Sequence, residues 1–412
     1  MRFFIKTFGC KQNHYESELI REMLILNGHE YSVSDYEKAI IHSCAVTGKA
    51  EYKTRDFTRR MVKRLGATNV AVIGCSADYH ADDYRDMGIV AITGNADKLK
   101  ARTYDALFGS STRQGSFYVG RFDSQTRAFL SIQDGCDFNC AYCIITKLRG
   151  PSLSRPSADI IAEAGTLIKN GKKEIVITGV NIGLWGKKEG LGLHDLIAEL
   201  VKIKDVRFRL SSLDPNQIDE KLLKYLQAGT NIAPHLHISL QSASDDVLKK
   251  HNRSYTGEMF RDLTYRVKEN NPGTRIGIDI IAGLPGESDK DFLRTTSILE
   301  ESDIDYMHIF KYSGREGTAA AAMPQVPSKT INERAGALHG MDKKIRERSL
   351  EKYFARIYEV IAERPSGEGI YIGISENYIE CAAPGIKQNE LFKFVPEKIK
   401  EGMYYGRKNH KI

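Results

Sequence analysis

The chain has 412 residues, so we expect two or three domains, because a single hydrophobic core stops growing beyond about 250–300 residues. Hydrophobic residues make up 41% and charged residues 27%, as in globular proteins, and the formal net charge is +7. No run of about 18 apolar residues occurs, and the first residues lack the apolar core of a signal peptide. The sequence therefore predicts a cytoplasmic protein with no membrane span.

The first ninety-five residues alternate short apolar runs with longer amphipathic stretches, as parallel α/β sheets do. Residues 15–28 are typical of a helix that ends at Gly28. We therefore predict an N-terminal α/β domain with a parallel sheet over residues 1–115. The expected strands are 2–8, 39–43, 70–74 and 89–93.

Cysteines follow three of these predicted strands. Because the carboxyl ends of parallel strands meet at one edge of a sheet, Cys10, Cys44 and Cys75 are expected to form one cluster of thiols. The seven cysteines of a chain without a secretion signal favour metal or redox chemistry over disulfides. A zinc site completed by His14 or His42 also fits this spacing. The remaining interpretation is three separate, inert buried cysteines.

A second series of strands begins after the polar segment 108–117, which we interpret as a linker. Six β-like runs recur with helical segments between them, and this pattern predicts a parallel sheet curled into a partial (βα)6 barrel over residues 122–345. Loops at the carboxyl ends of its strands would form the active face. The expected strands are 128–133, 174–179, 206–212, 235–241, 276–283 and 306–312.

The segment GCDFNCAYCII, residues 135–145, directly follows the first barrel strand. It contains Cys136, Cys140 and Cys143 with the spacing C-x3-C-x2-C. Structural zinc normally takes four protein ligands, and the first histidine after this segment is His194, so zinc is disfavoured. Three thiolates can instead hold three irons of a [4Fe-4S] cluster and leave the fourth iron open to an exchangeable ligand.

This cysteine loop, at the end of the first strand of a six-unit βα series, resembles that of the radical S-adenosylmethionine (SAM) superfamily. The resemblance implies that the open iron binds SAM, and that an electron from the reduced cluster cleaves SAM to a 5'-deoxyadenosyl radical. It also implies SAM contacts from the aromatic residue before the last cysteine and from TGVNIG, LSSLDP, LQSAS and IDIIAGLPGES at successive strand ends. The residues so implied are Tyr142, Gly179, Asn181, Ser211, Ser212, Gln241 and Asp279.

Nearly the whole chain resembles the radical SAM methylthiotransferases. The phrases that carry the resemblance occur in the family's order and include TFGCKQNHYESE, HSCAVTGKAEYKTR, IGCSADY, RAFLSIQDGCDFNCAYCIITKLRGP, PHLHISLQSASDDVLKKHNRSYT and YSGREGTAAAAMPQVP. The resemblance implies that Cys10, Cys44 and Cys75 hold a second [4Fe-4S] cluster, and that each product consumes two SAM molecules. It also implies that residues 351–412, whose apolar residues alternate as in short strands, form a small all-β TRAM domain that helps to bind the substrate.

The phrases Cys44-Ala-Val-Thr and Arg149-Gly-Pro resemble the branch of this family that modifies N6-threonylcarbamoyladenosine at position 37 of tRNA. We therefore expect insertion of a methylthio group at C2 of that base. Isopentenyladenosine in tRNA and an aspartate of a ribosomal protein are the alternative substrates. A non-catalytic iron-sulfur RNA-binding protein is a further alternative, although open irons would serve no purpose in it.

Basic residues indicate an RNA partner. Residues 393–412 contain six basic and two acidic residues, and such a segment attracts phosphates. We expect the anticodon stem-loop of tRNA as substrate, a reductant protein such as flavodoxin or ferredoxin, and a sulfur donor. Cys381 is interpreted as a packing residue. The predicted helix after Cys44 adds a second basic surface, formed by Lys49, Lys53, Arg55, Arg59, Arg60, Lys63 and Arg64.

Overall fold

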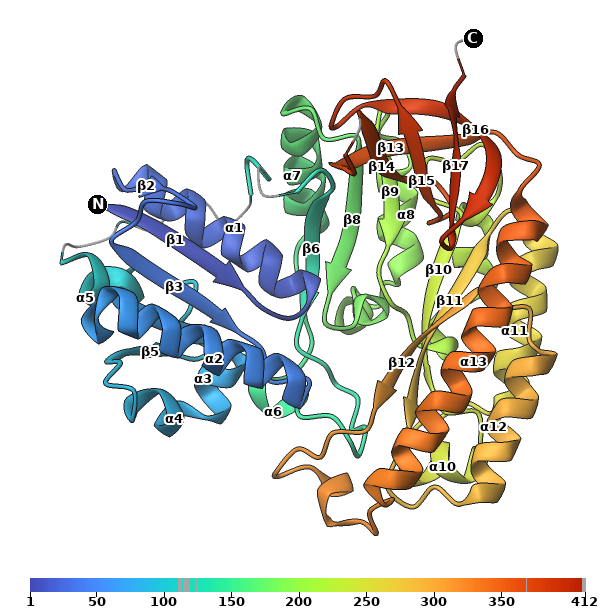
Figure 1. Cartoon of the computed structure of the whole chain (residues 1–412), viewed down its shortest axis with the longest axis horizontal. Coiled ribbons are helices and arrows are strands. Elements are labelled where there is room, and N and C mark those ends of the chain that lie inside the picture. Colours follow the sequence, from blue (N-terminus) through green and yellow to red (C-terminus); the bar gives the residue numbers. More distant parts are fainter. Residues whose placement is uncertain (110–112, 114–118, 123–124, 368, 410–412) are drawn as a thin grey trace.

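The computed structural model describes residues 1–109, 113, 119–122, 125–367 and 369–409. Most of the predicted linker lies outside the described residues, as does Lys411. The described part of the chain contains no helix with the length and apolar character that crossing a membrane requires. It folds into an N-terminal α/β layer, a central open barrel and a small C-terminal β-barrel (Figure 1).

The N-terminal domain is a parallel sheet of five strands in the order β2-β1-β3-β4-β5. Its elements are β1 (Arg2–Thr7), α1 (Lys11–Leu26), β2 (Glu30–Tyr31), β3 (Lys38–Ser43), α2 (Gly48–Leu65), β4 (Val70–Gly74), α3 (Cys75–Tyr79), α4 (Ala81–Arg85), β5 (Ala91–Thr93) and α5 (Asp105–Phe108). Alternate residues of the central strands enter two cores: Ile40 and Ile73 pack with α1, whereas Ile41 and Val72 pack with α2. Both faces are therefore covered, as a parallel sheet requires.

The central domain is a partial barrel of six parallel strands. Its elements are β6 (Ala128–Asp134), α6 (Ile145–Arg149), β7 (Leu153–Ser154), α7 (Ser157–Lys169), β8 (Glu174–Gly179), α8 (Leu193–Leu200), β9 (Arg207–Leu210), α9 (Glu220–Leu223), β10 (His235–Gln241), α10 (Asp245–Lys250), α11 (Gly257–Asn270), β11 (Arg275–Ala282), α12 (Asp289–Glu301), β12 (Tyr306–Lys311) and α13 (Ser328–Tyr353). Isolated bridges join β9 to the start of β10. Among the described strands none pairs β6 with β12, and α1 packs against β6 and β8 beside that open edge (Figure 1).

The C-terminal domain is a closed five-stranded barrel in the order β13-β14-β15-β17-β16. Its strands are β13 (Tyr358–Pro365), β14 (Ile370–Ser375), β15 (Glu380–Pro384), β16 (Leu391–Lys400) and β17 (Met403–Lys408). Cys381 lies in its hydrophobic core with Tyr358, Phe394 and Tyr404. The closed all-β architecture is consistent with the TRAM-like domain that the sequence predicts.

The C-terminal barrel packs on the amino-terminal ends of the central strands. Arg207 and Arg209 donate hydrogen bonds to the carbonyl groups of Ile374, Ser375 and Glu376. The cysteine loop follows the opposite, carboxyl end of β6, and a strand of six residues spans roughly 20 Å. An RNA that contacts both ends must therefore run along the side of the central barrel (Figure 1).

A buried carboxylate anchors this interface. Glu174 is fully buried, and its two oxygens accept hydrogen bonds from Arg207 Nε at 2.6 Å and Arg209 Nε at 2.7 Å. Burial alone would raise the pKa of Glu174, but the two guanidinium groups hold it well below its usual range. The same arginines bind the C-terminal domain, so Glu174 fixes the groups that join the two domains.

Replacement of Glu174 is expected to loosen the C-terminal domain. Glu174→Ala leaves the buried Arg209 guanidinium without a counter-ion and Arg207 with Glu359 alone, at 3.5 Å, which lowers the free energy of unfolding by about 3–5 kcal/mol. Urea unfolding and amide hydrogen exchange in β14 and β15 measure this loss. Glu380→Ala, which removes an exposed pair with Arg364, is the matched control and shifts stability by less than about 1 kcal/mol. Equal protection of β14 in wild type and Glu174→Ala would contradict the assignment.

Candidate functional site

The loop after β6 presents Cys136, Cys140 and Cys143 at the carboxyl end of the barrel. Its backbone is closed by hydrogen bonds from the Cys136 amide to the Gly150 carbonyl and from the Cys143 amide to the Cys140 carbonyl. Gly135, with φ of +70°, starts the turn, and a Cβ there would lie 2.0 Å from the Pro151 carbonyl oxygen. Only glycine therefore permits this loop.

Hydrogen-bond donors surround the three sulfurs. The Phe138 amide and Asn181 Nδ2 donate to Cys136 Sγ at 3.4 and 3.7 Å, and Arg253 Nη1 donates to Cys140 Sγ at 3.2 Å. Burial raises the pKa of the free Cys143 thiol to about 11. Two neutral amides and the Arg253 guanidinium therefore offer hydrogen bonds to thiolates that become negative on binding a metal cluster.

The N-terminal cysteines meet at one edge of their sheet, as predicted. Cys10 precedes α1, Cys44 follows β3 and Cys75 begins α3 after β4, and β1, β3 and β4 are adjacent strands. A Cβ on Gly9 would lie 2.7 Å from Cys44 Sγ, so the residue before Cys10 touches the second thiol. Burial raises the pKa of the Cys44 thiol to about 12, and the neighbouring Cys10 and Cys75 raise it further.

Neither histidine proposed for a zinc site is placed to complete one. His42 Nδ1 lies 2.9 Å from Ser17 Oγ, and its Nε2 lies 3.4 Å from a Glu16 oxygen without a hydrogen bond. Among the described residues, His42 forms no set of three possible metal ligands within 4.8 Å of one another. Burial lowers the pKa of His42 to about 4, which keeps its ring neutral. His14 packs against Phe129 and faces the Gln125 amide.

The spacing of the sulfurs also disfavours a single metal ion. In the described part of the chain, the one set of three ligand atoms within 4.8 Å of one another belongs to His237, Asp279 and His308, and it includes no cysteine. A zinc ion with Zn–S bonds of about 2.3 Å would hold its sulfurs about 3.8 Å apart. In neither cysteine triad do all three sulfurs lie within 4.8 Å of one another, so neither triad is arranged as such an ion would hold it.

A buried ion-pair network joins the two cysteine sites. Glu16 of α1 is 1% exposed, and its carboxylate contacts Lys98 Nζ at 2.8 Å and Arg149 Nη1 at 2.9 Å. Arg149 ends α6, immediately after the second cysteine loop, and also donates to Asn13 and Asp134. Burial would raise the pKa of Glu16, but Arg149 and Lys98 hold it well below its usual range.

Asn95 makes a second connection between the sites. Its Nδ2 lies 3.5 Å from Cys75 Sγ and 3.0 Å from the Leu148 carbonyl oxygen in α6. Lys98 Nζ donates to Asn95 Oδ1 at 2.6 Å. The helix that follows Cys143 is therefore fixed directly against the residues around Cys75.

Two adjoining cavities lie between the cysteine loops. One, of about 190 Å³, is lined by Cys136, Cys140 and Cys143 together with Asn181, Ser212 and Arg253. The other, of about 240 Å³, is lined by Val46 and Thr47, which follow Cys44, and by Asp279, Phe310 and Arg315. Both are lined by Tyr142, Cys143, Ile145 and Gln241, so these residues form a wall that the two cavities share. The barrel cysteines therefore line this region, and the segment that follows Cys44 reaches it from the N-terminal domain.

The predicted SAM contacts divide into two groups. Tyr142, Asn181, Ser212, Gln241 and Asp279 line one or both cavities. Gly179 and Ser211 lie beneath this surface instead. A Cβ on Gly179 would meet the Gln133 carbonyl oxygen at 2.7 Å, and the buried Ser211 donates its amide to the Ile177 carbonyl. These two residues shape the strand ends.

Arg253 was missed by the sequence reasoning as a site residue. Besides Cys140, it contacts Asp214 at 2.5 Å and the Ser239 carbonyl at 3.0 Å. Burial raises the pKa of Asp214, and the Arg253 guanidinium opposes this shift. Arg253 lies in the phrase KKHNRSYT, but an arginine after a helix gives no signal of the sulfur that it reaches.

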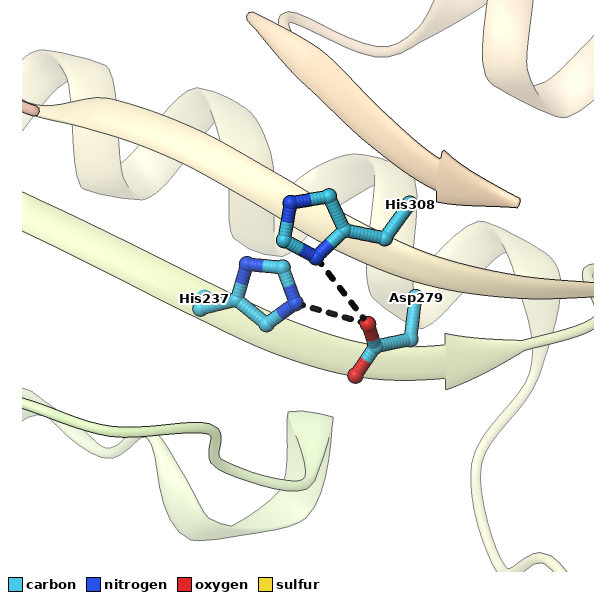
Figure 2. Close-up of side chains that lie close together, drawn as sticks. All are labelled: His237, Asp279 and His308. Carbon is cyan, nitrogen blue, oxygen red and sulfur yellow. Dashed lines mark hydrogen bonds and ion pairs between the residues drawn. The ribbon is translucent and has the colours of Figure 1, made fainter. Parts of the chain in front are cut away.

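Two histidines contact the carboxylate of one aspartate on neighbouring strands of the barrel. Figure 2 shows the rings of His237 from β10 and His308 from β12 pointing at the same oxygen of Asp279 from β11, at 2.8 and 3.6 Å. Burial would raise the pKa of Asp279, but the hydrogen bonds from the two histidines hold it well below its usual range. Asp279 therefore belongs to a histidine network and keeps one face toward the cavity.

The comparisons with known proteins agree with this architecture. Residues 130–299 match the Radical SAM superfamily, and residues 2–92 match the uncharacterized protein family UPF0004. The solved structure of the radical SAM methyltransferase TsrM from Kitasatospora setae, with cobalamin and a [4Fe-4S] cluster bound, aligns with a TM-score of 0.58. It is 12% identical, and the alignment covers 78% of this chain and 74% of TsrM. The fold is therefore that of a radical SAM enzyme, a superfamily that uses SAM and a [4Fe-4S] cluster.

Curated relatives narrow the family. The threonylcarbamoyladenosine tRNA methylthiotransferase MtaB of Rickettsia prowazekii is 37% identical over 353 residues, which are 82% of this chain and 82% of the relative. The tRNA-2-methylthio-N(6)-dimethylallyladenosine synthase of Bacillus cytotoxicus is 31% identical over 96% of this chain and 81% of that protein. The chain belongs to the radical SAM methylthiotransferase family.

Loss of Arg149 is expected to destabilise the join between the cysteine sites. Arg149→Met leaves the buried Glu16 carboxylate with Lys98 alone and costs about 3 kcal/mol of unfolding free energy. Urea unfolding of the metal-free protein measures the change. The control Arg85→Met removes an exposed pair with Asp82 and changes stability by less than about 0.5 kcal/mol. Equal stability of the two variants would contradict the structural role of Arg149.

Proposed function

We propose that this protein is a tRNA-modifying radical SAM enzyme that places a methylthio group at C2 of N6-threonylcarbamoyladenosine at position 37. The observation that carries the proposal is that Cys136, Cys140 and Cys143 line a cavity whose neighbour is lined by Val46 and Thr47, the residues that follow Cys44. Cys136, Cys140 and Cys143 would hold the cluster that binds SAM, and Cys10, Cys44 and Cys75 would hold the second cluster. When bound, the clusters and SAM supply the electron, the radical and the sulfur attachment that the transfer requires.

The residues of the chain position and protect this chemistry. Arg253, Asn181 and the Phe138 amide offset the charge of the first set of thiolates. Tyr142, Asn181, Ser212, Gln241 and Asp279 would contact SAM, and Gly179 and Ser211 keep the strand ends in place for it. Apolar side chains complete the lining of the second cavity; they are Val46, Ile145, Ile281 and Phe310. A bound substrate that covers them would exclude water and competing hydrogen donors, as radical chemistry requires.

The basic surface near the cavity supports an RNA substrate. Helix α2 begins at the cavity, where the Gly48 amide donates to Ser313 Oγ, and carries exposed basic residues along its length. Phosphate contacts from such a helix would hold the anticodon stem-loop while a splayed loop base enters the cavity. In the C-terminal domain, Lys393, Lys400, Arg407 and Lys408 each lie within 4 Å of a glutamate, so that surface is less positive than its composition indicates.

The threonylcarbamoyl substrate is supported by the printed name of the 37% identical relative, whereas the dimethylallyl substrate belongs to the name of the 31% identical one. The two substrates differ at N6 of the same base and would use the same reaction. We further propose that the protein acts in the cytoplasm, and that a flavodoxin or ferredoxin supplies electrons and a separate donor supplies sulfur.

Cysteine variants separate the roles of the two triads. After anaerobic reconstitution the wild type is expected to carry about eight irons per chain. Cys44→Ala should keep about four irons and reductive cleavage of SAM but lose methylthio transfer, whereas Cys140→Ala should lose SAM cleavage. Cys381→Ala, in the β-barrel core, is the control and should retain both. Full methylthio transfer by Cys44→Ala would contradict the proposed second cluster.

Analysis of tRNA nucleosides identifies the substrate. Mass spectrometry of tRNA from a strain lacking this gene is expected to show loss of the 2-methylthio form of N6-threonylcarbamoyladenosine. The same nucleoside without the methylthio group should accumulate. A strain expressing the Cys140→Ala variant should have the same nucleoside profile. Loss of the isopentenyl methylthio nucleoside alone would overturn the substrate assignment in favour of the dimethylallyl branch.

A further inference from the structure

Lys11 is a cation next to Cys10 in the chain, and the chemistry described above assigns it no task. It is the first residue of α1 and directly follows Cys10, at the helix that lies against β6 and β8. Its side chain is half-buried. Over the described parts of the chain, the Lys11 ammonium forms no hydrogen bond and no ion pair within 4 Å.

The other charged groups around Lys11 already have partners. The charges that act on Lys11 are those of Arg127, Arg209, Asp279 and Cys10. The two arginines are matched by carboxylates: Arg209 by Glu174 at 2.7 Å, and Arg127 by Glu363 at 2.5 Å. Asp279 accepts a hydrogen bond from His237. Lys11 therefore places a positive charge in this space without a fixed counter-ion in direct contact.

These neighbours also place the ammonium relative to the reaction. Cys10 belongs to the triad that would hold the sulfur, and Asp279 lines the cavity that reaches Cys143. His237 is a further residue on which the Lys11 charge acts. Lys11 thus lies between Cys10, its neighbour in the chain, and the charged groups of Asp279 and His237, which Figure 2 shows on adjacent strands.

The two candidate substrates differ in the group that such a cation recognises. A threonylcarbamoyl group ends in a free carboxylate, whereas a dimethylallyl group is an uncharged hydrocarbon. We propose that the Lys11 ammonium binds the carboxylate of the N6 substituent and thereby selects threonylcarbamoyladenosine over bases with neutral substituents. This inference rests on the proposed function. A charge-assisted hydrogen bond in a partly desolvated site favours the matching substrate by about 10- to 100-fold.

The test changes each partner of the proposed contact separately: Lys11 in the protein and the carboxylate in the RNA. The reconstituted wild type and Lys11→Met are compared on two anticodon stem-loop RNAs, one with the threonylcarbamoyl carboxylate and one with the corresponding carboxamide. Lys11→Arg retains the charge, and Lys6→Met, an exposed lysine of β1, is the matched control. RNA affinity by fluorescence anisotropy and KM for methylthio transfer are measured, with iron content and SAM cleavage as checks on the clusters.

The expected preference requires both the Lys11 ammonium and the RNA carboxylate. Wild type and Lys6→Met should bind the carboxylate RNA about 10- to 100-fold more tightly than the carboxamide RNA. Lys11→Met should bind both RNAs alike, and Lys11→Arg should recover part of the preference. If Lys11→Met loses its clusters, two comparisons remain. The wild type shows whether the RNA carboxylate is recognised, and Lys11→Arg shows whether a change at residue 11 weakens that preference.

Two results would overturn the inference. Equal affinity of the wild type for both RNAs would exclude carboxylate recognition, and an equal loss on both RNAs in Lys11→Met would mean that Lys11 only balances Asp279. Failure of the proposed function itself has a different signature, because the wild type would then transfer no methylthio group to either RNA while still cleaving SAM.

Discussion

The contact between Glu16 and Arg149 holds the site together. One residue belongs to the helix after Cys10 and the other to the helix after Cys143, so their ion pair ties the two cysteine loops to each other. A buried carboxylate without a cation is strongly unfavourable, which makes any arrangement that separates these loops costly. Lys98 and Asn95 extend the same network to the third N-terminal cysteine. The buried ion pair of Glu16 and Arg149 therefore keeps the two cysteine loops close together.

A second charge network has the same role at the other end of the barrel. Glu174 fixes Arg207 and Arg209, which in turn bind carbonyl groups of the C-terminal domain. The RNA-binding surface expected there lies at the strand beginnings, whereas the cysteines follow the strand ends (Figure 1). A substrate that contacted both would have to span the length of the strands, which fits the extended shape of a stem-loop whose modified base is presented at its tip.

Much of the fold was predictable because its signals are local. Apolar runs of four to eight residues predicted the strands of both parallel sheets, and cysteines after three of them predicted one thiol cluster. Strand β2, with two residues, is too short to carry a pattern, and α1 begins at Lys11 and not at Tyr15. The phrase Arg149-Gly-Pro was read only as a family signature. Its arginine gains its role from Glu16, 133 residues earlier, and no local pattern encodes such a pairing.

The cysteines of the site could be predicted from the sequence, whereas most of the side chains that contact the site residues could not. The cysteine spacing disfavoured zinc at Cys136, Cys140 and Cys143, whereas at the N-terminal triad the sequence left a zinc site with His14 or His42 open. In the fold, His14 packs against Phe129 and His42 lies beside Ser17. Asp279 was expected to contact SAM, and no sequence pattern indicated that two histidines from neighbouring strands also contact its carboxylate, because only the folded sheet brings β10, β11 and β12 together. Arg253 likewise reaches its sulfur through a turn of the chain that the sequence does not reveal.

The location of iron in a crystal of the anaerobically reconstituted protein tests the central claim most directly. Anomalous scattering at the iron edge should give two separate peaks, one at Cys136, Cys140 and Cys143 and one at Cys10, Cys44 and Cys75, facing each other across the cavity lined by Gln241. A single peak at the barrel, or an N-terminal peak turned away from that cavity, would contradict the account.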